Sequence, residues 1–171
     1  MSSIDILIDA DTIARRVKEL GAQITAAHAG KDLVLVPVLN GSFVFAADLA
    51  RAIDLPLAID FFGCRSYEGT ASTGVVQTTL DLSHPIEGKH VIVVEDIVDT
   101  GLTMTYMLDN LRTRRPASVQ LASLLSKPAR RKVDVAIDYL GFEIEDVFVV
   151  GYGLDFDEHY RNVPYLGVLR S

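Results

Sequence analysis

Residues 91–105 read Val-Ile-Val-Val-Glu-Asp-Ile-Val-Asp-Thr-Gly-Leu-Thr-Met-Thr. The first four residues are all β-branched, the pattern of a strand buried on both faces of a parallel sheet. Glu95 and Asp96 follow where this strand is expected to end, and Asp99 comes three residues later. A helix is predicted next, because apolar residues recur at helical intervals at Met104, Met107, Leu108 and Leu111. The stretch therefore predicts a strand, a short acidic loop and a helix.

The loop that joins this strand to this helix has the features of an anion site. Backbone N–H groups and the helix dipole converge there, Gly101 permits a close approach and a positive φ, and Thr100 and Thr103 add hydroxyl donors. The neighbouring acids would repel a bare phosphate. Carboxylates do, however, hydrogen-bond sugar hydroxyls and bind hydrated Mg²⁺. The predicted ligand therefore combines a phosphate, a ribose and magnesium.

The rest of the chain repeats the alternation of strands and helices. A first helix is expected after Asp9 or Asp11, with Ile13, Val17, Leu20 and Ile24 on its buried face. Strands are predicted at 33–38, 57–63, 75–82 and 119–125, and a helical pattern runs through Phe43, Ala46, Ala47, Ala50 and Ile53. This order predicts an α/β fold, a mostly parallel central sheet flanked by helices. Ligands bind such sheets at the carboxyl ends of the strands, so residues 40–42 should lie beside the acidic loop.

Composition sets limits on the class of protein. A chain of 171 residues with 49% hydrophobic residues is expected to form a single domain, residues 1–171. The net charge of −7 disfavours nucleic-acid binding, and neither a signal-peptide pattern nor a membrane-length apolar run is present, so a cytoplasmic protein is expected. A single cysteine, Cys64, excludes an intrachain disulfide, and the four histidines show no metal-ligand spacing.

Residues 95–101, Glu-Asp-Ile-Val-Asp-Thr-Gly, resemble the signature of the type I phosphoribosyltransferases, in particular the hypoxanthine-guanine branch. The resemblance runs from about Leu33 to the end of the chain and is also strong at residues 147–161. It implies a purine salvage enzyme that transfers the 5-phosphoribosyl group from phosphoribosyl pyrophosphate (PRPP) to a 6-oxopurine, without ranking hypoxanthine, guanine and xanthine. It further implies a small hood built from the chain ends, a flexible lid hairpin and a homo-oligomer, since the family forms dimers and tetramers.

The resemblance also implies roles for individual residues. Asp99 would be the catalytic base that accepts a proton from the purine ring. The ribose and 5′-phosphate would be bound by Glu95, Asp96, Asp99, Thr100, Gly101, Leu102 and Thr103. Pyrophosphate would be bound by Asn40, Gly41 and Arg161, in a loop that in the family often contains a non-proline cis peptide. Magnesium would be held by Glu95, Asp96 and Asp155.

The purine would be held by Lys127, Phe148, Val149 and Asp155, with Lys127 donating to the exocyclic oxygen that adenine lacks. Ser66 and Tyr67 would belong to the lid. Many relatives have Lys where this chain has Asn40, which leaves neutralisation of the pyrophosphate to magnesium and Arg161. Plainer interpretations exist: Phe148 as a core aromatic, the acidic residues around Asp155 as a solvated turn, Ser42 as a helix cap, and the lid as a hairpin tip.

Other functions compete with this assignment. Asp-Thr-Gly also occurs in aspartic proteases, but those are all-β and need a second copy, and no Walker A sequence is present. The segment 112–132 holds seven Lys or Arg and no acid, so an RNA-binding regulatory protein of the same fold is a binding-module alternative. The acid at position 99 argues against that alternative. Adenine or orotate specificity is the closer enzymatic rival.

Overall fold

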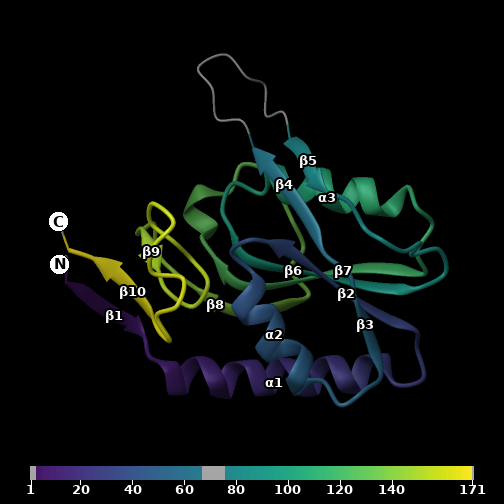
Figure 1. Cartoon of the computed structure of the whole chain (residues 1–171), viewed down its shortest axis with the longest axis horizontal. Helices are drawn as coiled ribbons and strands as arrows, with labels where there is room; N and C mark the ends of the chain where they lie inside the picture. Colours follow the sequence, from purple (N-terminus) through teal and green to yellow (C-terminus); the bar gives the residue numbers. More distant parts are fainter. Residues whose placement is uncertain (1–2, 67–75, 171) are drawn as a thin grey trace.

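The computed structural model describes residues 3–66 and 76–170. Their centre is a seven-stranded sheet in the order β5-β4-β2-β6-β7-β8, with β3 beside β2 (Figure 1). Neighbouring strands are parallel except for the antiparallel pair β4 and β5, so the mostly parallel sheet is confirmed. The strands are β2 (Leu33–Leu39), β3 (Leu57–Ile59), β4 (Phe62–Ser66), β5 (Val76–Leu80), β6 (His90–Val98), β7 (Ser118–Ser126) and β8 (Tyr139–Glu143).

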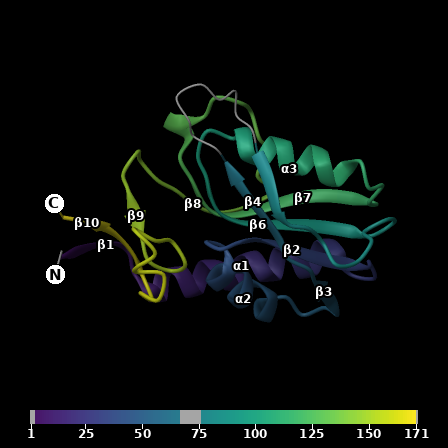
Figure 2. The same cartoon turned by 45° about the horizontal axis from the view of Figure 1, so that its top comes forward.

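Helices cover both faces of the sheet. Helices α1 (Ala10–His28) and α2 (Phe43–Ala52) pack on one face, and α3 (Leu102–Arg112) packs on the other (Figure 2). Side chains alternate between the two cores: Leu33 and Leu35 of β2 pack with α1 and α2, whereas Val34 and Val36 pack with α3. A strand buried in this way has no polar face, and for that reason β2 and β6 read as continuous apolar runs.

The predicted helices form where their apolar spacing places them. The carboxylate of Asp9 caps α1 by accepting a hydrogen bond from the backbone N–H of Thr12 at 2.7 Å. The expected apolar faces of α1 and α3 are both buried. In α2 the expected face is partly wrong, because Phe45, Ala46 and Leu49 are buried while Phe43 is 46% exposed. Within the described ranges, no helix has the length and apolar character needed to cross a lipid bilayer.

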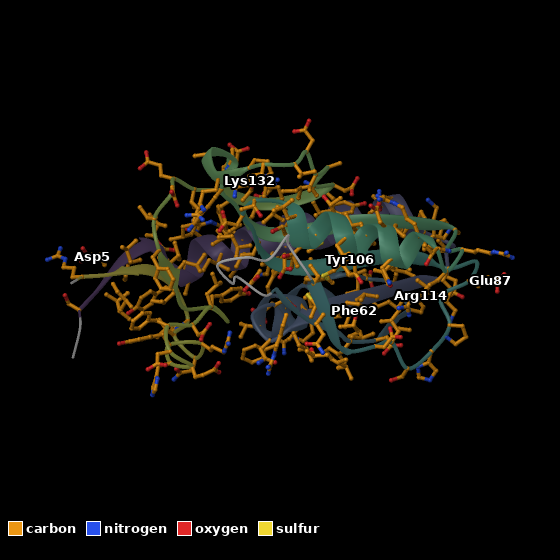
Figure 3. The ribbon with its side chains drawn as sticks, turned by 90° about the horizontal axis from the view of Figure 1, so that it is seen from above. Asp5, Phe62, Glu87, Tyr106, Arg114 and Lys132 are labelled. Carbon is orange, nitrogen blue, oxygen red and sulfur yellow. The ribbon has the colours of Figure 1, made fainter. Side chains whose placement is uncertain are left out.

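The two chain ends form the predicted hood, a separate antiparallel sheet in the order β1 (Ile4–Ile8), β10 (Leu166–Leu169), β9 (Val149–Val150). Figure 3 shows Asp5 of β1 at one end of the molecule, with Glu87 and Arg114 at the opposite end. Glu87 precedes β6 and Arg114 precedes β7, so the parallel strands begin at that far end. Their carboxyl ends therefore point toward the hood.

The strand expected at 57–63 is in fact two strands, β3 and β4, separated at Asp60. The Asp60 backbone N–H still donates to the carbonyl of Leu35, but its buried carboxylate turns to accept hydrogen bonds from the backbone N–H groups of Ser83 and His84, each at 2.9 Å. A carboxylate satisfied by a distant turn breaks the strand here, and local sequence carries no sign of that partner.

Helices α1 and α2 pack closely at Gly21. A Cβ added at Gly21 would lie 2.5 Å from the carbonyl oxygen of Ala52. Alanine normally stabilises a helix interior by about 1 kcal/mol relative to glycine, whereas overpacking costs about 1–3 kcal/mol. The carbonyl oxygen of Ala52 belongs to the backbone and cannot move aside as a flexible side chain would. We therefore expect Gly21→Ala to lower the free energy of unfolding by about 1–2 kcal/mol, measured by urea denaturation. The exposed control Ala22→Gly should cost about 1 kcal/mol from propensity alone. A stabilised Gly21→Ala variant would contradict the close packing.

Candidate active site

The acidic pair Glu95 and Asp96 lies on a part of β6 that has a neighbouring strand on one side only. Pairing between β6 and β7 continues to Val98, whereas pairing between β6 and β2 ends at Val94. The strand thus runs beyond the end expected at Glu95. The freed backbone is satisfied locally, since the N–H of Asp96 donates to Glu95 Oε1 at 2.8 Å and the N–H of Ile97 to Asp96 Oδ1 at 2.7 Å.

Burial raises the pKa of Glu95 well above its usual value, and the neighbouring charge of Asp96 raises it further. Two adjacent carboxylates in this setting repel each other. Ribose hydroxyls that donate hydrogen bonds, or a divalent cation, would relieve that repulsion. The pair is therefore suited to a polyhydroxylated or metal-bearing ligand.

The loop that follows forms a hollow in front of α3. Gly101 has φ 88° and is the first residue before the helix, where a Cβ would lie 2.6 Å from the carbonyl oxygen of Val133. In the described part of the chain no side chain caps α3, which leaves the N–H groups of Thr103 and Met104 available to a ligand. The cavity here measures about 170 Å³ and is lined by Glu95, Ile97, Val98, Asp99, Thr100, Gly101, Thr103 and Met104.

A second loop, residues 40–42 at the end of β2, meets this hollow. The peptide bond between Leu39 and Asn40 is cis, as the resemblance implied. A Cβ on Gly41 would lie 1.9 Å from Asp96 Oδ2, so the Gly41 backbone rests directly against the Asp96 carboxylate. The buried hydroxyl of Ser42 donates to the carbonyl of Val38 at 2.6 Å and does not cap α2, so the interpretation of Ser42 as a cap is wrong. The loop at residues 40–42 therefore lies beside the acidic end of β6, as the sheet topology predicted.

An ionic network joins Lys127 to Asp99 at the end of β7. Lys127 is only 8% exposed, and its Nζ lies 3.9 Å from Asp146 Oδ1. The short helix η1 (Pro128–Arg130) carries Arg130, whose Nε lies 2.7 Å from Asp99 Oδ1 and whose Nη1 lies 3.7 Å from Asp146 Oδ1. Sequence reasoning missed Arg130 and Asp146. The one feature of the sequence that could have indicated Arg130 is its place in a run of basic residues, since a functional acid can form an ion pair with such a residue.

The hood contributes an exposed aromatic pair. Phe148, just before β9, is 56% exposed, which excludes the core-aromatic interpretation, while Val149 is buried in the strand. Phe156 packs edge-on against Phe148 with ring centroids 5.8 Å apart. Phe156 was not identified from the sequence, although an aromatic residue between two acids in a turn is itself a sign of exposure. The pair offers an apolar face to a flat ligand.

Arg161 and Asp155 come together as an ion pair, with Arg161 Nη2 3.2 Å from Asp155 Oδ1. Arg161 Nη1 also donates to the carbonyl of Gly153 at 2.8 Å. Asp155 is thus a partnered residue rather than part of a solvated turn. Across residues 3–66 and 76–170, no three acidic, His or Cys side chains gather as a metal site, so Asp155 does not join Glu95 and Asp96 in one cluster.

The predicted lid falls mostly outside the described residues. Ser66 ends β4 and pairs in register with Val76 of β5, which confirms the hairpin strands at the base of the predicted lid. Tyr67 and the following residues up to 75 lie outside the described part of the chain.

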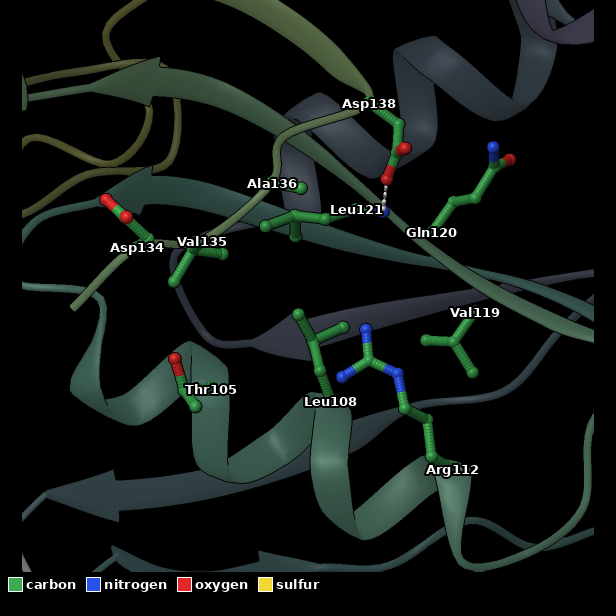
Figure 4. A pocket seen from close by; sticks show the side chains of 10 residues that line it. All are labelled: Thr105, Leu108, Arg112, Val119, Gln120, Leu121, Asp134, Val135, Ala136 and Asp138. Carbon is green, nitrogen blue, oxygen red and sulfur yellow. Dashed lines mark hydrogen bonds between the residues drawn. The ribbon is translucent and has the colours of Figure 1, made fainter.

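The basic segment 112–132 is not an open cationic surface. Arg114 forms an ion pair with Asp81 at 2.8 Å, and Arg112 pairs with Asp109 at 3.1 Å. Arg112 also borders a pocket of about 210 Å³ between α3, β7 and residues 134–138, to which Asp134 and Asp138 contribute carboxylates (Figure 4). Local acids therefore balance several of these cations, which disfavours a phosphate-backbone surface.

A parallel sheet with an acidic strand end, an amide-lined hollow at a helix N-terminus and a hood above it defines an α/β enzyme that handles a phosphorylated ligand. Comparison with known proteins agrees. The family model described as "Phosphoribosyl transferase domain" matches residues 3–157. The chain is 47% identical to the hypoxanthine-guanine phosphoribosyltransferase of Streptococcus pneumoniae (strain ATCC BAA-255 / R6), covering 97% of this chain and 93% of that protein.

Two further relatives match as fully. The hypoxanthine-guanine-xanthine phosphoribosyltransferase of Tritrichomonas foetus is 45% identical, over 97% of this chain and 91% of that one. The crystal structure of a hypoxanthine phosphoribosyltransferase from Staphylococcus aureus superposes with a TM-score of 0.94 at 47% identity, covering 97% of this chain and 91% of that chain. This chain belongs to the type I phosphoribosyltransferase family, in its hypoxanthine-guanine branch.

The raised pKa of Glu95 makes a prediction about stability. The folded chain keeps the Glu95 proton to a higher pH than the unfolded chain, whose pKa is about 4.5, so ionisation of Glu95 costs stability as the pH rises above that value. Glu95→Gln cannot ionise and keeps the acceptor for the Asp96 N–H. In metal-free buffer we expect it to raise the unfolding midpoint by a few degrees at about pH 8 and to change it little at about pH 5, measured by calorimetry.

The exposed residue Glu87, which precedes the same strand, provides the control, since Glu87→Gln should leave the midpoint unchanged at both pH values. An equal shift at both pH values for Glu95→Gln would show that ionisation of Glu95 is not the cause.

Proposed function

We propose that this chain transfers the 5-phosphoribosyl group from PRPP to a 6-oxopurine, producing IMP or GMP and pyrophosphate in purine salvage. The single observation that supports this most is the contact of Gly41 with the Asp96 carboxylate beside the hollow at residues 99–103. The hollow, the acidic pair and the loop at residues 40–42 thus lie next to one another. That combination matches the three parts of PRPP, its 5′-phosphate, its ribose and its pyrophosphate.

The 5′-phosphate is assigned to the hollow, where the backbone N–H groups of Thr100, Gly101, Leu102 and Thr103 and the hydroxyls of the two threonines would donate hydrogen bonds. Glu95 and Asp96 would accept hydrogen bonds from the ribose hydroxyls and hold the ring as positive charge builds on it. The pyrophosphate would lie between the backbone of Asn40 and Gly41 and the guanidinium of Arg161.

The carboxylates fit magnesium in the manner usual for this ion. Mg²⁺ is commonly held by one or two carboxylates together with substrate phosphates, and a complete protein cage is not needed. Glu95 and Asp96 would hold one ion, and Asp155 would support another on the pyrophosphate side. When bound, magnesium supplies positive charge that neutralises the leaving group. The raised pKa of Glu95 is consistent with a site that gains from a cation.

The purine is assigned to the space between Lys127 and the hood. Lys127 can only donate, so it would select an exocyclic oxygen over an amino group, and its low exposure keeps water from competing for it. Phe148 would stack on the ring, the backbone of Val149 would hydrogen-bond its edge, and Asp155 would lie beside it. The relatives' names span hypoxanthine, guanine and xanthine, and we do not rank these bases for this chain.

Asp99 would accept the proton released from the purine ring nitrogen as the neighbouring nitrogen attacks the sugar. The guanidinium of Arg130, whose Nε lies 2.7 Å from Asp99 Oδ1, would have to leave this carboxylate or share it with the purine for the proton to be accepted. We further infer that residues 1–171 form one catalytic domain that acts as a homo-oligomer in the cytoplasm, an inference that rests on the family resemblance and on composition.

A direct assay tests the proposal. With PRPP and Mg²⁺, the chain should convert hypoxanthine, guanine or both to the monophosphate, while adenine and orotate should react at least about 100-fold more slowly, because adenine lacks the exocyclic oxygen that Lys127 reads and orotate is a pyrimidine without the imidazole ring of a purine. Spectrophotometric rates with each base provide the measurement. Comparable rates with adenine would contradict the role of Lys127. Salt-dependent RNA binding without turnover would favour the regulatory alternative.

The role of Asp99 predicts a separation of binding from chemistry. Asp99→Asn keeps the shape of the side chain but removes its basicity, so PRPP affinity should stay within about twofold while turnover with hypoxanthine falls by roughly 10²-fold or more. Calorimetric titration and steady-state kinetics measure the two quantities. Asp109→Asn, an exposed acid on α3, serves as the matched control and should leave both unchanged. Near-normal turnover of Asp99→Asn would show that another group takes the proton.

A further inference from the structure

A hydrogen bond ties the turn that follows β9 to α2 in the body of the molecule. Tyr152 is 7% exposed, and its hydroxyl donates to the carboxylate of Asp48 on α2, 104 residues away in the sequence. Tyr152 has φ 48°, a left-handed conformation that an L residue with a large side chain adopts at a cost. Its neighbours Gly151 and Gly153 also have positive φ. This turn is built to bring the tyrosine ring inward.

The same turn places Gly153 in contact with both parts of the proposed pyrophosphate site, the loop at residues 40–42 (the Gly41 loop) and Arg161. A Cβ on Gly153 would lie 2.3 Å from the carbonyl oxygen of Gly41, so the two backbones are in direct contact. The Gly153 N–H donates to the Arg161 carbonyl at 2.9 Å, and the Gly153 carbonyl accepts from Arg161 Nη1 at 2.8 Å. A displacement of this turn would therefore move Arg161 away from the Gly41 loop.

Apolar packing fixes only part of this turn, since Tyr152 and Leu154 belong to the core shared with α1 and α2 but the interface beside them is hollow. A cavity of about 360 Å³ lies between the hood and the two helices, lined in part by Val44, Asp48, Tyr152, Arg161 and Val163. A hollow interface forfeits much of the contact that would resist sliding. Burial, followed by the hydrogen bond to Asp48, raises the pKa of Tyr152, so the hydroxyl stays protonated and keeps donating throughout the ordinary range of pH.

We propose that Tyr152 and Asp48 are positioning residues for pyrophosphate recognition, which hold the turn at Gly153 so that Arg161 and the Gly41 loop act on the same group. This inference rests on the function proposed above. In this proposal neither side chain contacts the substrate. They act through the backbone of Gly153 and through α2, whose N-terminus follows the Gly41 loop.

A hydrogen bond that only stabilises the fold would affect the binding of all ligands alike. A hydrogen bond that positions the pyrophosphate site would affect only ligands that carry a pyrophosphate, and the experiment measures this difference. The ligands PRPP and pyrophosphate use both halves of the site, whereas IMP has no pyrophosphate. For Tyr152→Phe with Mg²⁺ present, we expect the dissociation constants of PRPP and pyrophosphate to rise roughly 5- to 30-fold and that of IMP to stay within about twofold, measured by calorimetric titration. In kinetics, KM for PRPP should rise more than kcat falls.

Variants of Asp48 separate the hydrogen bond from charge. Asp48→Ala should reproduce the loss seen in Tyr152→Phe, and the double variant should be no worse than either single one, because the two residues act as a unit. Asp48→Asn retains an acceptor oxygen and should restore PRPP affinity to within about threefold of the unaltered protein. Arg51→Ala is the matched control. Arg51 is the exposed ion-pair partner of Asp48, and its removal should leave the affinity for PRPP unchanged.

Equal weakening of PRPP, pyrophosphate and IMP binding in Tyr152→Phe would overturn the inference, and so would unchanged PRPP affinity in that variant. The proposed function is judged separately on the unaltered protein. Failure of that protein to bind PRPP or to convert any 6-oxopurine would reject the function, whatever the variants do. The thermal unfolding midpoint of each variant is compared with the assay temperature. A midpoint close to that temperature identifies a loss of binding that comes from unfolding.

Discussion

The site depends on the unequal pairing of β6. This strand keeps β7 as a neighbour to Val98 but has β2 as a neighbour only to Val94. The backbone of Glu95 and Asp96 stays anchored on one side, while the other side opens to the crevice. Acids in the middle of a sheet would be intolerable, and acids on a free loop would not be held in place. The raised pKa of Glu95 is the electrostatic cost of this half-buried position.

Backbone contacts, more than side chains, bring the loops of the crevice together. Gly41 lies against the Asp96 carboxylate, Gly153 against the Gly41 carbonyl, and Gly101 against the Val133 carbonyl. In each case a Cβ would lie closer than 3 Å to the neighbouring atom. Three segments far apart in the sequence can approach this closely only where side chains are missing. The result is a surface formed by backbone, whose N–H groups can donate to a phosphate as an apolar pocket cannot.

Local patterns predicted the parts of the fold that local physics determines. The apolar runs of β2 and β6, the cap at Asp9 and the buried face of α3 all follow from residue spacing, and the structure confirms them. The errors fall where a distant partner decides. The strand break at Asp60 needs amides at Ser83 and His84, and the ionic network of Lys127 needs Asp146 and Arg130, which no spacing rule connects. The family resemblance supplied candidate roles at the site but not these partners.

Ion pairs between residues at the site also determine how strongly the site can attract an anion. The chain carries a net charge of −7 and has the neutral residue Asn40 in the loop proposed to bind pyrophosphate, yet its proposed substrate is strongly anionic. The cations at the site are already paired, Arg161 with Asp155, Arg130 with Asp99 and Lys127 with Asp146. Paired cations attract an incoming anion weakly, but their side chains are oriented in advance and lose less entropy on binding. In the proposed site, attraction would then come from backbone amides and from magnesium arriving with the substrate, so the placement of the Gly41 and Gly101 backbones would limit affinity more than the number of basic residues does.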